Sequence, residues 1–157
     1  MKKSMTLLVL ISLLGPALVQ ISLAQDQDVA AVVNPKNPVD NLTKSDLRKI
    51  FAGEKRAWPG GLSIKLLVRV PGSYERVILL RLLGMSESEY KQHWILQVFH
   101  GEAQAEPVAL FSNGMQKEAI AAFPGAIALV VIGDVKPGMK VLKVDGLLPA
   151  TVGYSLH

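Results

Sequence analysis

Arg69 and the turn Pro71-Gly72-Ser73 have residue types and spacing that suit the binding of an anion. They stand where an apolar run ends and a helical pattern begins, and a helix N-terminus carries unpaired N–H groups and a partial positive charge. Gly72 lets a ligand approach the backbone, Ser73 offers a hydroxyl and an N–H, and Arg69 adds a planar cationic fork. A purely structural role remains open for both residues. In that case Ser73 only caps the helix, and Arg69 only pairs with a nearby carboxylate such as Glu75.

The elements around this turn would place it at one edge of a sheet. We expect a strand over residues 62–70. Its apolar residues Leu66, Leu67, Val68 and Val70 are nearly unbroken, which suits a strand covered on both faces, as in parallel sheets. The pattern of residues 74–83 predicts a helix that Gly84 closes. Ligands of open α/β sheets usually lie at the carboxyl ends of strands, which is where Arg69 falls.

The rest of the chain alternates strands with helices. Apolar runs bounded by turn residues predict strands at 29–33, 126–132 and 141–144. Thr43 with Asp46, and Ser86 with Glu89, have the spacing of capping boxes, so we expect helices from Thr43 to Gly53 and from Ser86 through Phe99. A further helix is expected over residues 112–123. This order predicts one α/β domain with a mostly parallel sheet flanked by helices.

The first 24 residues have the pattern of a secretory signal peptide. Lys2 and Lys3 precede an apolar stretch over residues 5–14, and Ser22-Leu23-Ala24 has the small residues that a signal peptidase requires. We expect cleavage after Ala24, export to the periplasm and a mature domain over residues 25–157 that is not embedded in the membrane. The alternative is an uncleaved anchor, because residues 5–24 approach the length of a spanning helix.

Composition excludes several function classes. Removing Lys2 and Lys3 from the 17 basic residues leaves 15 against 13 acidic ones, and no basic run marks a nucleic-acid site. Cysteine is absent, so thiol catalysis and cysteine-based metal sites are excluded. His93 and His100 are seven residues apart and lack a third ligand. Because the sequence shows no acid–base pair and no nucleophile motif, we do not expect an enzyme. We also expect no cofactor and no metal site.

Several motifs occur in an order that resembles the substrate-binding proteins of phosphate ABC transporters. The resemblance covers residues 29 to about 145 and is carried by these stretches: Asn34-Pro35, Asn37-Pro38-Val39, Leu42, residues 46–53 (DLRKIFAG), Trp58-Pro59-Gly60-Gly61, residues 69–73 (RVPGS) and Pro124-Gly125-Ala126-Ile127. In that family an Arg-x-x-Gly-Ser turn contacts the oxyanion. The resemblance implies a type II periplasmic-binding-protein-like fold and binding of phosphate or a similar oxyanion by Arg69, Gly72 and Ser73.

The same resemblance shows departures that bear on function. Tyr74-Glu75 replaces the Gly-Thr that commonly follows the serine, and Glu75 would weaken phosphate binding if it points inward. Ala128-Leu129 replaces Gly-Tyr. The resemblance implies that the chain holds one lobe of a two-lobed clamshell, so a partner lobe, another protein or an ABC permease is the expected partner. The alternative function is a non-catalytic periplasmic interaction module that has lost ligand capture.

Overall fold

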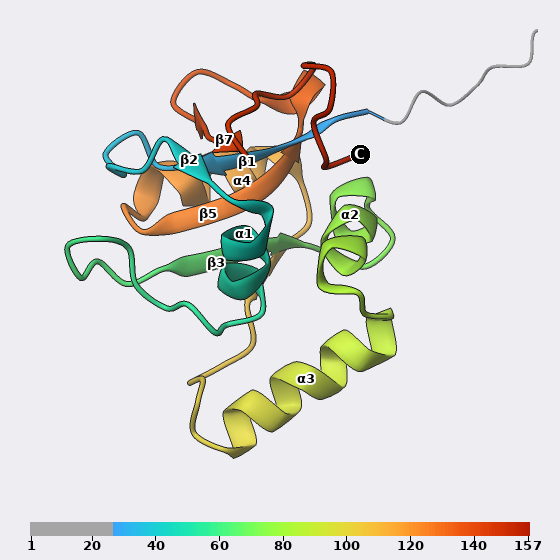
Figure 1. The fold of residues 1–157 in the computed structure, drawn as a ribbon. Helices are drawn as coiled ribbons and strands as arrows, with labels where there is room; N and C mark the ends of the chain where they lie inside the picture. The colour runs from blue at the N-terminus through green and yellow to red at the C-terminus, as the bar shows by residue number, and fades with distance from the viewer. Residues whose placement is uncertain (1–26) are drawn as a thin grey trace, which may run out of the picture.

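The fold has three layers, with helices on both faces of a five-stranded sheet (Figure 1). The computed structural model describes residues 27–157, so the predicted signal peptide lies outside the described residues. In spatial order the strands are β4 (Val108–Leu110), β3 (Lys65–Arg69), β5 (Ala126–Val131), β1 (Val29–Val33) and β6 (Lys140–Val141). The predicted α/β class is confirmed.

Four of the five strands run in the same direction. β3 pairs in parallel with both β4 and β5, whereas β1 pairs antiparallel with β5 and with β6. β1 is therefore the one strand of this sheet that runs against the others, and the sheet is mainly parallel as expected. A separate parallel pair joins β2 (Asn41–Leu42) to β7 (Lys143–Val144).

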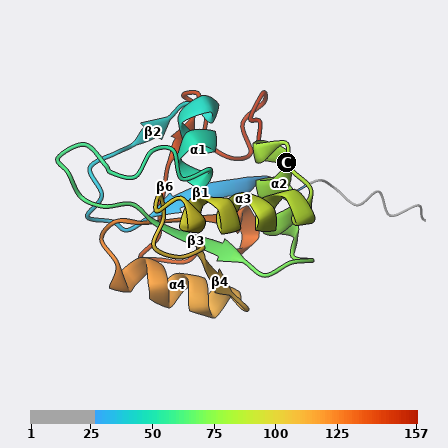
Figure 2. The ribbon, with the colours of Figure 1, turned by 90° about the horizontal axis from the view of Figure 1, so that it is seen from below.

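The alternation of side chains along each strand divides the core between the two faces. On β5, Ile127 and Leu129 pack with α1 (Lys44–Phe51) and α2 (Tyr74–Leu83), whereas Ala126 and Ala128 face α4 (Asn113–Ala122). Figure 2 shows α1 and α4 on opposite sides of the strands. All six residues of β5 are buried, which explains why its sequence is continuously apolar.

Local capping chemistry sets the helix ends close to where the sequence predicts them. Ser73 caps α2, which ends at Gly84 with a left-handed φ of 67°. Ser86 and Glu89 form a complete capping box at the start of α3 (Glu87–Phe99). Thr43 accepts from the N–H of Asp46 at 2.9 Å and caps α1. Among the described residues, no helix is long and apolar enough to cross a membrane.

Two short stretches differ from the expectation. β4 has three residues and was not predicted, because a run this short has no measurable period and is defined by its pairing with β3. The predicted strand at 141–144 is divided between β6 and β7, which belong to different sheets. Leu142 between them is fully buried, and its N–H bonds to the Ala31 carbonyl.

α3 stands away from the sheet (Figure 1) and is attached through the face that carries Tyr90 and Trp94. Trp94 packs on Gly53 just after α1, and His93 Nε2 donates to the Ala52 carbonyl at 2.8 Å. At its other end, Arg76 of α2 makes an ion pair of 2.5 Å with Glu87. Beyond Trp94, the apolar side chains Ile95, Leu96, Val98 and Phe99 at the end of α3 are exposed.

Candidate anion-binding site

The candidate site lies at the carboxyl ends of β3 and β4, whose following helices pack on opposite faces of the sheet. β3 and β4 are parallel neighbours, with Arg69 opposite Leu110 in the register. The chain leaves β3 into α2 on one face of the sheet and leaves β4 into α4 on the other. Adjacent strands whose connections go to opposite faces open a crevice at their carboxyl ends, and ligands of α/β sheets bind in such crevices. Arg69 is the last residue of β3 and stands at this point.

The guanidinium of Arg69 is held at the start of α4. Like Leu67 two residues earlier, Arg69 falls on the α4 face of the sheet. One terminal nitrogen donates to Asn113 Oδ1, and the other donates to the Phe111 carbonyl at 3.4 Å. These contacts use two of the five N–H donors of an arginine. The Nε atom is buried and has no partner among residues 27–157. The side chain is thus positioned, and most of its donors remain unused.

Two helix N-termini open beside Arg69. Ser73 caps α2 and Ser112 caps α4, and each accepts from a backbone N–H in the first turn of its helix at 3.2 Å. Each helix has ten residues, enough to carry a partial positive charge at its start. An anion between the two starts would meet two positive ends and a cationic side chain. Sequence reasoning placed only the first of them at the site.

The hydroxyl of Ser73 is already engaged. Its oxygen accepts from the N–H of Arg76, and its O–H donates to the Val70 carbonyl at 3.0 Å, so Ser73 acts as the cap of α2. Gly72 has a φ of 88°, and no heavy atom lies within 4 Å of where a side chain would begin. The backbone at Gly72 is therefore open to a ligand, whereas the Ser73 hydroxyl must rearrange to contact one.

Glu75 is buried without neutralising Arg69. It is 5% exposed and borders, together with Arg69, a cavity of about 10 Å³ between α2 and the sheet. Among the described residues no ion pair joins Glu75 to Arg69. The second alternative, an Arg69–Glu75 pair, is therefore not present. The carboxyl group nevertheless points inward close to the site, which was the condition for a weakened anion site.

The residues that hold Arg69 were missed from the sequence. Asn113 lies 44 positions away, and Phe111 contributes a backbone carbonyl rather than a side chain. The available signal was Ser112, which opens a predicted helix, but its neighbouring strand β4 was not recognised. Had β4 been placed beside β3, the start of α4 would have been expected next to Arg69.

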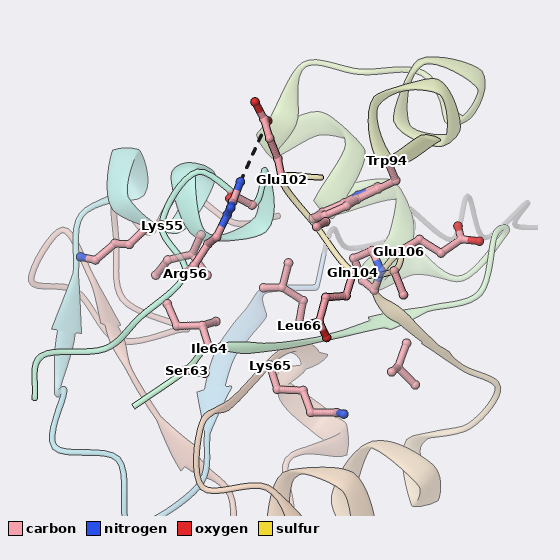
Figure 3. Close-up of a pocket in the computed structure, with 16 residues that line it drawn as sticks. Lys55, Arg56, Ser63, Ile64, Lys65, Leu66, Trp94, Glu102, Gln104 and Glu106 are labelled. Carbon is pink, nitrogen blue, oxygen red and sulfur yellow. Dashed lines mark hydrogen bonds and ion pairs between the residues drawn. The ribbon is translucent and has the colours of Figure 1, made fainter. Parts of the chain in front are cut away.

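The larger hollows lie elsewhere. One of about 490 Å³ is lined by the amino ends of β3 and β4 and by the loop after α3 (Figure 3). Trp94 and Gln104 line it, and Arg56 reaches across its mouth to Glu102 at 4.0 Å. It is at the opposite ends of the strands from Arg69. Arg69, Gly72 and Ser73 do not line it.

Comparison with solved structures identifies the fold. An ABC-type phosphate transport receptor from Vibrio cholerae matches with a TM-score of 0.64 at 23% identity, over 79% of this chain and 48% of that chain. A putative phosphate ABC transporter substrate-binding protein with bound phosphate from Clostridium perfringens matches with a TM-score of 0.64 at 20% identity, over 78% and 47%. PstS from Borrelia burgdorferi gives 0.59 at 21% identity, over 79% and 49%. No protein-family model matches the chain.

These matches define the class of fold. The chain has the fold of one lobe of a phosphate ABC transporter substrate-binding protein, as its motifs suggested. It spans about half the length of the structures that it matches.

Proposed function

We propose that this chain is an exported, non-catalytic binding protein that takes phosphate or a similar oxyanion at Arg69, Gly72 and Ser73. The observation that carries the proposal is the position of Arg69, which is held between two capped helix starts at the carboxyl ends of β3 and β4. Its free N–H donors and the open backbone at Gly72 are suited to the oxygens of a tetrahedral anion. The proteins of similar fold named above are phosphate transport proteins, which supports the same ligand class.

Binding by this lobe alone is expected to be weak. The crevice is open to water, so each hydrogen bond to the anion competes with solvent and contributes only about 0.5–1.5 kcal/mol. Glu75 adds a negative charge nearby. A few such contacts correspond to a dissociation constant of roughly 1 mM, whereas tight capture requires a second lobe or partner, such as an ABC permease complex, to close the site.

Calorimetric titration of phosphate into the purified exported protein tests the proposal. We expect saturable binding that Arg69→Ala abolishes and that Arg48→Ala leaves unchanged, because Arg48 is an exposed arginine of α1 far along the chain from the site. Absence of binding at millimolar phosphate, or equal binding by both variants, would overturn it.

A second candidate function is an interaction module that keeps the lobe but has lost ligand capture. It is favoured by the buried Glu75, by the engaged hydroxyl of Ser73 and by the coverage of only half of each matched structure. Affinity capture from envelope extracts distinguishes the two. A stable protein partner whose binding is independent of phosphate favours this candidate, and recovery of the protein alone would count against it.

Export itself is part of the proposal and has its own test. Cleavage after Ala24 leaves a mature chain that begins at Gln25. Intact-mass measurement of the protein from the periplasmic fraction should give the mass of residues 25–157. A protein that retains residues 1–24 in the membrane fraction would instead support the uncleaved anchor.

A further inference from the structure

The second half of α3 presents an apolar face to solvent. Ile95, Val98 and Phe99 follow helical spacing and are 51%, 40% and 82% exposed. Lys91 lies one turn before Ile95 on the same face and is also exposed. We call these four residues the α3 face. An apolar helix face of this kind on a small protein marks a contact with another molecule.

A hollow lies beside the most exposed side chain of the α3 face. It has a volume of about 500 Å³ and is lined by the apolar residues Trp94, Ile95, Val98, Phe99 and Ala105 together with Glu106. Phe99 is at the edge of this hollow and projects into solvent. A projecting aromatic ring and an apolar hollow thus occur side by side on one surface. This is the arrangement that a two-fold contact requires, since each copy supplies both the ring and the hollow.

Charges at the two ends of the α3 face have opposite signs. Lys91 stands at the amino end, and Glu102 and Glu106 follow the carboxyl end. Among the described residues, Lys91 takes part in no ion pair, and Glu102 is in only one, the 4.0 Å contact with Arg56. Two antiparallel helices would bring the basic end of each copy to the acidic end of the other. Their helix dipoles would also oppose, which favours the antiparallel over the parallel pairing.

We propose that the α3 face binds a second copy of this chain, with the two α3 helices antiparallel. A two-fold axis between Leu96 and Gln97 places Phe99 of each copy opposite Trp94 of the other, so that each ring enters the facing hollow. The same axis places Ile95 opposite Val98. This contact is on α3 and does not involve Arg69, so it holds or fails independently of the proposed anion binding.

Apolar side chains of the α3 face supply part of the area that such a contact needs. An aromatic side chain buries about 150–250 Å², so the two copies of Phe99 alone supply roughly 300 Å². Stable interfaces begin at about 1,200 Å² in total. Ile95, Leu96 and Val98 of both copies and the charged ends extend the contact toward that size.

Sedimentation equilibrium of the exported protein, purified from cells that express the full chain, tests the proposal. We expect a reversible dimer that Phe99→Glu weakens at least tenfold, because the ring leaves the apolar hollow and a charge takes its place. Val152→Glu is the matched control, since Val152 is 98% exposed and lies outside α3. Circular dichroism confirms that both variants are folded. A monomer at all concentrations, or equal weakening by the two variants, would overturn the proposal.

Two further variants test the antiparallel geometry. Lys91→Glu should weaken the dimer, and adding Glu102→Lys, which the axis places opposite position 91, should restore it to within about threefold. Because the chain has no cysteine, Ile95→Cys and Val98→Cys copies can be mixed and oxidised, and they should cross-link to each other more than either does to itself. Preferred Ile95→Cys self-linking, or a monomer that binds lipid vesicles or the uncleaved N-terminal segment through Phe99, would show that a different occupant covers the α3 face.

Discussion

Gly53 and Gly84 offer a controlled test of how α3 is attached. Both glycines follow helix ends with left-handed backbone, at φ of 77° and 67°. They differ in their surroundings, because a Cβ at Gly53 would lie 2.8 Å from a ring carbon of Trp94, whereas nothing lies within 4 Å at Gly84. Substitution by alanine therefore imposes the same backbone cost at both positions, whereas only Gly53→Ala adds a steric clash.

The magnitudes follow from these two contributions. A residue with a Cβ in the left-handed conformation costs about 1–2 kcal/mol, so both variants lose this much of the free energy of unfolding. Gly53→Ala also forces the indole of Trp94 to shift, and overpacking of a core costs about 1–3 kcal/mol more. Gly53→Ala should thus lower the free energy of unfolding by about 2–5 kcal/mol and Gly84→Ala by about 1–2 kcal/mol. The difference reports the contact between α3 and the end of α1.

Urea unfolding followed by tryptophan fluorescence measures both values. With a slope of about 2 kcal/mol per molar urea, the Gly53→Ala midpoint should fall about 1 M below that of Gly84→Ala. In a Trp94→Leu background the extra cost should vanish, because the ring that the added methyl group would strike is gone. Equal losses for the two glycine variants, or an extra cost that persists without Trp94, would refute the packing of Trp94 on Gly53.

Three other outcomes are expected. Glu75→Gln should tighten phosphate binding several-fold in calorimetry, since it removes a negative charge beside the site. The control Glu118→Gln, on the exposed side of α4, should leave the affinity unchanged. Equal affinities of the two variants would contradict the role given to Glu75. The hydrogen bond from Arg76 lowers the pKa of Glu87, so this ion pair contributes stability above about pH 4.5 that is lost as the pH falls through the lower pKa of the folded state. Because Glu87 is 43% exposed, Glu87→Gln should cost only about 1 kcal/mol or less at pH 7, and its difference from the parent protein in urea midpoint should shrink below pH 4. Burial raises the pKa of Tyr154, so its neutral form contributes stability up to about pH 10 that declines at higher pH, and Tyr154→Phe should show a smaller loss of stability between pH 10 and 11.5.

Helix boundaries could be read from the sequence because they depend on neighbouring residues. The hydroxyl of Ser86 and the carboxylate of Glu89 satisfy N–H groups within one turn, and Gly84 adopts a backbone conformation that few other residues tolerate. Such contacts span three or four positions. The start of α2 and the whole of α3 were therefore predicted to the residue.

Strand pairing could not be read in the same way. β4 is three residues long and is a strand only because β3 lies beside it. Its partner β3 is separated from it in the chain by α2 and α3, so no local pattern identifies the pairing. The missed strand is the reason that Asn113 and Phe111 were not expected beside Arg69.

For the candidate site, the sequence by itself determined the residue types, the turn and its place at a strand end. Arg69, Gly72 and Ser73 were predicted together because they are adjacent in the chain. Only the tertiary structure decided that Arg69 turns to the α4 face while Glu75 is buried on the α2 side, and that the Ser73 hydroxyl is used within its own cap. The physical reason is that donors and charges act over a few ångströms of space, and the strands and helices that bring them within that distance are far apart in the chain.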